Sequence, residues 1–138
     1  MHKLATTVLA FACLALSSIT SAEQVGVKLA KDDLAAFIPG TRAVYVIKGG
    51  STHRWTNEPD GKFVASTDSK SVYLVGVRAF TAPGTWRISD DGKYCIDIGW
   101  KRYPESWCRF VYREPSGGYY MTNTDDPNAE RHNVELTK

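Results

Sequence analysis

Short apolar segments separated by turn residues make up most of the sequence after Thr41, and this pattern limits the fold more than any other feature. The segments are rich in β-branched and aromatic residues, whereas the turns carry Gly, Pro and Asp, as in Pro59-Asp60-Gly61. The predicted strands are residues 41–48, 53–57, 62–68, 72–80, 85–89, 94–100, 106–113 and 119–123. Such a series predicts a mainly β, antiparallel meander, which must close as a barrel or a sandwich to hide its edges.

One short helix is predicted ahead of the first strand. Residues 29–38 place Leu34 and Ile38 at helical spacing, and Pro39-Gly40 ends the segment. Residues 23–28 are expected to be a loose leader. Residues 124–138 are rich in Asp, Asn and Pro and predict an irregular polar tail, so that a single β-rich domain spans residues 29–123.

The first 22 residues have the three parts of an export signal. A short positive start at His2 and Lys3 is followed by an apolar run of about a dozen residues and by the small residues 17–22. The run is shorter than the roughly 20 apolar residues that span a bilayer, and a buried N-terminal helix is the alternative interpretation. We expect cleavage after Ala22, a periplasmic or secreted protein, and no transmembrane segment in the mature chain.

Cleavage would also change the charge. The full chain carries a formal net charge of +2, and the loss of Lys3 leaves +1. A nucleic-acid surface would need a clustered basic excess, so nucleic acid is not an expected partner.

Two cysteines, Cys95 and Cys108, remain once Cys13 leaves with the signal. An even pair in an oxidising compartment predicts a disulfide, which would stabilise the fold by about 3 kcal/mol. A metal or redox pair is the competing interpretation, but neither cysteine lies in a C-x-x-C motif.

The disulfide gives a geometric test of the strands around it. If the cysteines face each other across a hairpin, Ile96 faces Trp107, Tyr94 faces Arg109 and Asp97 faces Ser106 on the disulfide side. The turn is then either the two residues Lys101-Arg102 or a longer loop through Pro104, because neither turn residue suits the positive φ of tight hairpins.

Catalytic and metal motifs are sparse, so no enzyme and no cofactor are predicted. The mature chain has two histidines, His53 and His132, and contains no G-x-S-x-G nucleophile motif. An enzyme built on converging carboxylates is the weakest of the functions considered. An oxygen-rich group in the tail offers only weak metal-site candidates, because it lacks the spacing of a calcium loop. These are Asp125, Asp126, Asn128 and Glu130.

Aromatic residues interleaved with arginines are the most suggestive feature for function. Core packing is the simpler explanation, but Trp, Tyr and Arg also dominate binding surfaces. If Arg109 or Asp97 points inward, it needs a partner, and an Arg109–Asp97 pair inside the barrel would provide one. The candidate binding residues are Trp86, Asp97, Trp100, Tyr103, Trp107 and Arg109.

Several blocks resemble a family of small, uncharacterised secreted proteins of proteobacteria. A helix ending in Pro-Gly (34–40) is followed by G-T-W-R (84–87), D-G-x-x-C (91–95) and C-x-x-x-Y (108–112), and the resemblance spans residues 29–122. It implies export, a β fold and the disulfide, and it implies nothing about catalysis.

These observations together predict an exported small β-barrel that binds a small ligand or a protein of the cell envelope. The alternative is an inhibitor or accessory factor of an envelope or host enzyme. Periplasmic lysozyme inhibitors act in this way, and Ser116 to Tyr119 is a partial echo of their Ser-Gly-x-x-Tyr loop.

Overall fold

A computed structural model describes residues 25–69 and 78–138 of the chain. It contains one short helix and a sheet of nine strands. The elements in chain order are β1 (Val27–Lys28), α1 (Lys31–Phe37), β2 (Arg42–Val46), β3 (Thr52–Thr56), β4 (Lys62–Ser69), β5 (Arg78–Ile88), β6 (Tyr94–Ile98), β7 (Glu105–Arg113), β8 (Tyr119–Thr122) and β9 (His132–Thr137).

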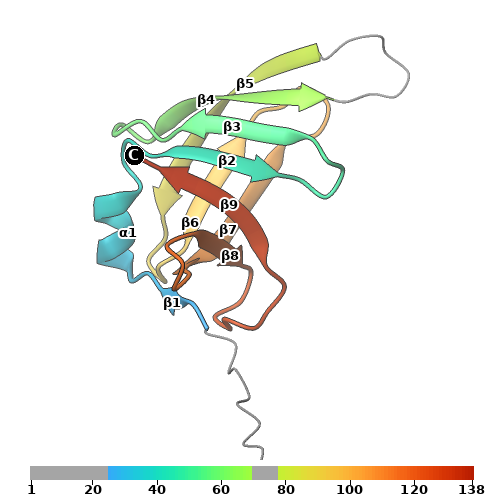
Figure 1. The fold of residues 1–138 in the computed structure, drawn as a ribbon. Coiled ribbons are helices and arrows are strands. Elements are labelled where there is room, and N and C mark those ends of the chain that lie inside the picture. Colours follow the sequence, from blue (N-terminus) through green and yellow to red (C-terminus); the bar gives the residue numbers. More distant parts are fainter. Residues whose placement is uncertain (1–24, 70–77) are drawn as a thin grey trace, which may run out of the picture.

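Eight of the strands form a closed antiparallel barrel, as the meander pattern predicts (Figure 1). Strands β2 to β8 pair consecutively along the chain, and β9 closes the ring by lying between β8 and β2. Closure removes the free edges that a flat sheet would expose. Helix α1 covers one end of the barrel, next to the C-terminus of the chain (Figure 1).

Two segments, residues 27–28 and 132–137, are more ordered than the sequence predicts. The expected leader contains β1, in which Val27 pairs with Arg113 and Lys28 with Tyr112 of β7. The expected irregular tail is wrong for His132–Thr137, which form the closing strand β9. The pattern is hard to recognise there because Val134 and Leu136 are the only apolar residues of β9 that face inward, and the residues before them are polar.

A single strand, β5, replaces the two strands expected on either side of Pro83-Gly84. The carbonyl of Pro83 accepts a hydrogen bond from the amide of Gly99, which follows β6. Because the N–H and C=O of a strand residue point to the same side, the N–H that proline lacks would also point toward β6, and no hydrogen bond with β4 is lost. At Gly84 a Cβ atom would overlap the ring of Phe63, which explains a glycine within the strand. The first part of the expected 72–80 strand, residues 72–77, lies outside the described residues.

The disulfide and the predicted register of its hairpin are confirmed. Cys95 and Cys108 are bonded, with their Cα atoms 4.0 Å apart, and Asp97 faces Ser106 as expected. The ladder ends at the pair Ile98–Glu105, so the connection is the longer loop, residues 99–104.

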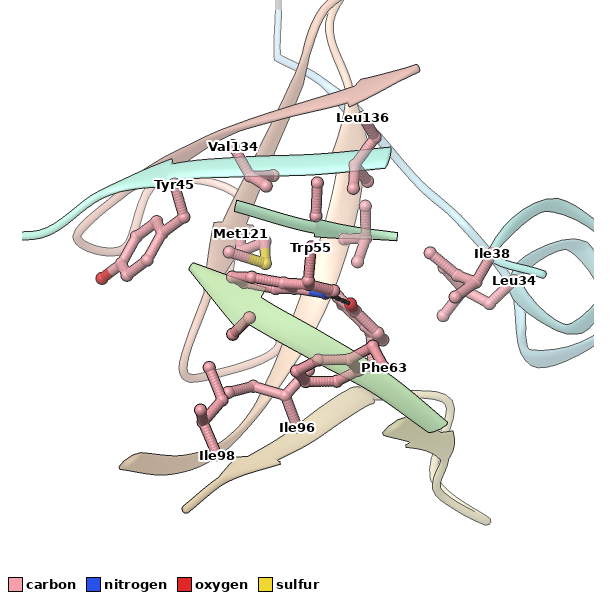
Figure 2. Close-up of a cluster of buried hydrophobic side chains, with 14 of the residues drawn as sticks. Leu34, Ile38, Tyr45, Trp55, Phe63, Ile96, Ile98, Met121, Val134 and Leu136 are labelled. Atoms are coloured by element: carbon pink, nitrogen blue, oxygen red, sulfur yellow. Dashed lines mark hydrogen bonds between the residues drawn. The ribbon is translucent and has the colours of Figure 1, made fainter. Parts of the chain in front are cut away.

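The core fills the inside of the barrel. Alternate residues of each strand point inward, and Tyr45 lies at the end of the core opposite Leu34 and Ile38 of the helix segment (Figure 2). We call the end covered by α1 the helix end, and the end at Tyr45 the far end.

A closed hydrogen-bond network lies near the helix end. The indole of Trp55 donates to Asn57 Oδ1 at 3.1 Å and to the hydroxyl of Tyr94 at 3.0 Å, and that hydroxyl donates to Asn57 Oδ1 at 2.7 Å. The Asn57 amide donates to Thr41 Oγ1 at 3.0 Å. Burial raises the pKa of Tyr94 far above its usual value, against the opposing effect of the bonds from Trp55 and Asn57. The network therefore holds neutral, fully paired groups.

Candidate functional site

Ionisable side chains gather inside the far end of the barrel. On β7, strand alternation turns Cys108 outward and Arg109 inward, opposite Tyr94. Two histidines approach from other strands, His53 from β3 and His132 from β9. The far-end cluster consists of Tyr45, His53, Glu105, Trp107, Arg109 and His132.

The carboxylate of Glu105 is the most fully bonded group of this cluster. Its Oε1 accepts Trp107 Nε1 at 3.0 Å, and its Oε2 accepts Trp100 Nε1 at 3.2 Å. His53 Nδ1 lies 2.8 Å from Oε2. Burial raises the pKa of Glu105, but the donors around the carboxylate outweigh burial and hold this pKa below its usual value. Glu105 therefore stays ionised and ties the 99–104 loop to β3 and β7.

Arg109 is the opposite case, a buried charge with few partners. Its side chain lies against two rings, with Cζ 4.5 Å from the centre of Trp107 and 5.4 Å from that of Tyr45. The residue is 9% exposed. Its Nε donates to Asn123 Oδ1 at 3.1 Å, whereas its buried Nη1 has no hydrogen-bond partner. No carboxylate in the described part of the chain forms a salt bridge with Arg109.

His132 presents a second buried nitrogen without a partner, its Nε2. Burial lowers the pKa of His132 below its usual value, and the positive charge of Arg109 lowers it further, against a smaller opposing effect of Glu130. The neutral imidazole is therefore favoured at neutral pH.

A surface groove of about 710 Å³ reaches this cluster where β2 and β9 separate. Their ladder ends at the pair Tyr45–Val134, and both Tyr45 and His132 line the groove. This volume lies within the range of roughly 300–1,000 Å³ that small-ligand sites occupy. Arg109 packs against Tyr45, so one ring that contacts the guanidinium also lines the groove.

Three of the six candidate binding residues come together at the far end: Trp100, Trp107 and Arg109. Trp86 lies toward the helix end, where its indole donates to the carbonyl of Glu58 at 2.8 Å. Tyr103 is 73% exposed on the 99–104 loop.

The Arg109–Asp97 pair that we considered does not form. Asp97 points outward and accepts a hydrogen bond from Ser106, on the same face as the disulfide. Asp97 lies two residues after Cys95 and therefore shares the outward face of the disulfide. Arg109 lies one residue after Cys108 and therefore faces the core.

Two of the four weak metal candidates, Asp125 and Asp126, have protein partners. Asp125 forms a salt bridge with Lys28 at 2.7 Å, and Asp126 accepts the backbone amide of Asn128 at 2.8 Å. Within residues 25–69 and 78–138, no group of three or more His, Cys, Asp or Glu side chains could hold a metal ion. In the same ranges no helix is long and apolar enough to cross a membrane.

Sequence reasoning missed His53, Glu105 and His132 as members of a site. A signal was available for Glu105, because the confirmed hairpin register places it on the same face as Trp107 and Arg109. No sequence signal places His132 in the site, because the polar pattern of its segment predicts no strand there.

Comparison with known proteins supports one part of the resemblance, the membership of an uncharacterised family. A family model described as "Protein of unknown function (DUF995)" matches residues 11–108. The chain belongs to this family. The match ends at Cys108, so Arg109 and His132 lie beyond it. No curated protein and no solved structure matches the chain.

Proposed function

We propose that this protein is exported and binds a small anionic molecule of the carboxylate class at the far end of its barrel, without catalysis. The observation that carries the proposal is Arg109, a nine-tenths buried guanidinium whose Nη1 has no partner in the described part of the chain. A buried charge without a counter-ion costs several kcal/mol, so a fold that retains one needs another reason to keep it.

The surroundings of Arg109 favour a carboxylate. The rings of Tyr45 and Trp107 cover the guanidinium, and Asn123 occupies its Nε, so Nη1 is left for a ligand. Guanidinium groups bond carboxylates through paired N–H donors, and aromatic walls around them strengthen the interaction by excluding water. The groove between β2 and β9 is lined by Tyr45, one of the two rings that contact Arg109.

The absence of catalysis in this proposal rests on the state of Glu105. Each of its carboxylate oxygens accepts an indole N–H, and His53 lies 2.8 Å from Oε2, so these contacts hold Glu105 ionised in a fixed structural position.

The proposal is tested by titrating acetate and benzoate into the oxidised protein purified from the exporting cell, with tryptophan fluorescence and calorimetry as readouts. Arg109→Gln should raise the dissociation constant at least tenfold, whereas Arg109→Lys should retain part of the affinity. Arg42→Gln, on the exposed outer face of β2, is the matched control and should bind as the wild type does. If neither anion binds, or if Arg109→Gln binds unchanged, the proposal is wrong.

The export part of the proposal has its own test. Intact-mass analysis of the same preparation should show a chain beginning at Glu23. A chain that still carries residues 1–22 would refute cleavage after Ala22.

A protein partner, such as an envelope or host enzyme that the protein inhibits or assists, is the second candidate. It is favoured by the exposed Tyr103, over whose ring Arg102 lies with Cζ at 5.5 Å from the centre. Tyr103→Ala should then abolish cross-linking to that partner without changing anion binding. Retained cross-linking would exclude this loop as the contact.

A further inference from the structure

Three buried nitrogen atoms at the far end have no hydrogen-bond partner, but one of them, His53 Nδ1, lies 2.8 Å from Glu105 Oε2. The other two belong to different strands. One is Nη1 of Arg109 on β7, and the other is Nε2 of His132 on β9. Buried polar groups in folded proteins are nearly always paired, so each such atom calls for an explanation. The two residues are also coupled, because the charge of Arg109 disfavours the protonated form of His132.

We propose that His132 is the second ligand of the carboxylate that Arg109 binds, and that its imidazole takes up one proton when the anion binds. This inference rests on the proposed function and adds the residue that makes binding depend on pH. Tyr45 connects the two residues, because it packs against Arg109 and lines the groove together with His132.

Protonation strengthens the contact of an imidazole with an anion. A neutral histidine has one donor nitrogen and one acceptor nitrogen, whereas the imidazolium has two donors and a positive charge. A charged donor opposite a carboxylate forms a shorter and stronger hydrogen bond than a neutral one does. An anion between Arg109 and His132 also neutralises the guanidinium charge that disfavours the imidazolium, so binding and protonation support each other.

The other charged groups near His132 do not supply this anion. Glu130 precedes the strand and has only a minor effect on the imidazole. Arg131 lies over the ring of Tyr120 and 3.7 Å from Glu114, and Lys48 lines the groove from the β2 side. On β8 the residue opposite His132 is Met121, which does not titrate.

The pH dependence of binding follows from the thermodynamic linkage between anion binding and protonation of His132. The pKa of His132 is below its usual value in the free protein and is raised in the complex, so the complex holds more protons between these two values. Affinity therefore increases as pH falls through this window, by up to about tenfold per pH unit for one proton, and it levels off below the free value. Above the pKa of the complex, only the Arg109 contact remains.

The test is calorimetry of benzoate binding at about pH 5.5 and about pH 7.5, in buffers of different ionisation enthalpy. The wild type should bind at least about tenfold more tightly at the lower pH and take up close to one proton. His132→Gln keeps an amide near the position of the imidazole but cannot titrate, so it should bind with little pH dependence and without proton uptake.

Nuclear magnetic resonance titration of the imidazole signals assigns the proton to a residue. Benzoate should raise the pKa of His132 in the wild type, and the signal of this residue is identified by its loss in His132→Gln. The inference is overturned if benzoate binds through Arg109 without proton uptake, or if His132→Gln keeps the wild-type pH dependence. The proposed function fails separately if benzoate and acetate bind at neither pH.

Discussion

The two ends of the barrel treat buried polar groups in opposite ways. At the helix end, Asn57 connects Trp55, Tyr94 and Thr41 in a network of neutral groups. At the far end, Arg109 carries a charge and, like His132, leaves a nitrogen unpaired. The ends share one core and one set of strands, so the difference does not arise from the fold as a whole.

The comparison separates residues that stabilise the barrel from residues that are available to a ligand. A satisfied neutral network adds to stability and to a single packing arrangement. An unpaired buried charge reduces stability and persists where it has a use, as in binding sites that exist before the ligand arrives. Removing side chains at the helix end should therefore cost stability, whereas changes at the far end should cost binding.

The largest effect is expected at the helix end for Trp55→Ala. Trp55 is 3% exposed and stacks on Phe63 with ring centres 5.4 Å apart. Its loss should lower the free energy of unfolding by about 4 kcal/mol, through the cavity and the unpaired Asn57 and Tyr94. Urea unfolding measures this value. Val64→Ala, at a position that is 68% exposed, is the control and should change stability by less than about 0.5 kcal/mol.

An intermediate effect on stability is expected for a substitution of Glu105, whose two carboxylate oxygens each accept a hydrogen bond. Because the pKa of Glu105 is lowered in the fold, its contribution to stability is complete above the usual carboxyl value and is lost as pH falls through the lowered value. Glu105→Gln should remove this part of the acid-side slope, which is at most about 1.4 kcal/mol per pH unit.

Chemical unfolding across the acid range gives the slope for both proteins. Glu135→Gln, on the outer face of β9, is the matched control and should leave the slope unchanged. Equal slopes for wild type and Glu105→Gln would mean that the carboxylate is not held by its donors.

The smallest effect on stability is expected for Arg109→Met, although its effect on binding should be large. Methionine preserves much of the apolar contact with Trp107 and removes the unpaired charge, so the free energy of unfolding should change by less than about 1 kcal/mol or should rise. A loss of more than about 3 kcal/mol would show that Arg109 supports the fold and would remove the contrast between the two ends.

Local patterns predicted much of the fold. The helix at 29–38, the turns that bound the strands and the register around Cys95 and Cys108 follow from spacing, propensity and cysteine geometry. The closing strand β9 did not, because its pairing with β2 is a long-range contact that leaves little trace in a segment of six residues. Pro83-Gly84 predicted a strand break for a related reason. The residues that permit a proline and a glycine within β5, Gly99 and Phe63, are distant in the sequence.

The candidate site was predicted only in part. Trp100, Trp107 and Arg109 could be selected because aromatic and arginine residues are dense on one hairpin. His53 and His132 come from strands far from that hairpin, and each was a lone histidine in a polar stretch of sequence. Only the closed barrel brings them to Glu105 and Arg109.

The pairing of β2 with β9, in which Arg42 faces Thr137, also has a kinetic consequence. Ring closure has to wait for the last strand, and the entropy of bringing such distant segments together is paid before the contacts are gained. Barrels of this kind fold on a timescale of about milliseconds to seconds, far more slowly than local helices. For the export that we propose, this delay would keep the newly made chain open long enough to be threaded across a membrane. The short hairpin of Cys95 and Cys108 can be cross-linked early, before the ring is complete.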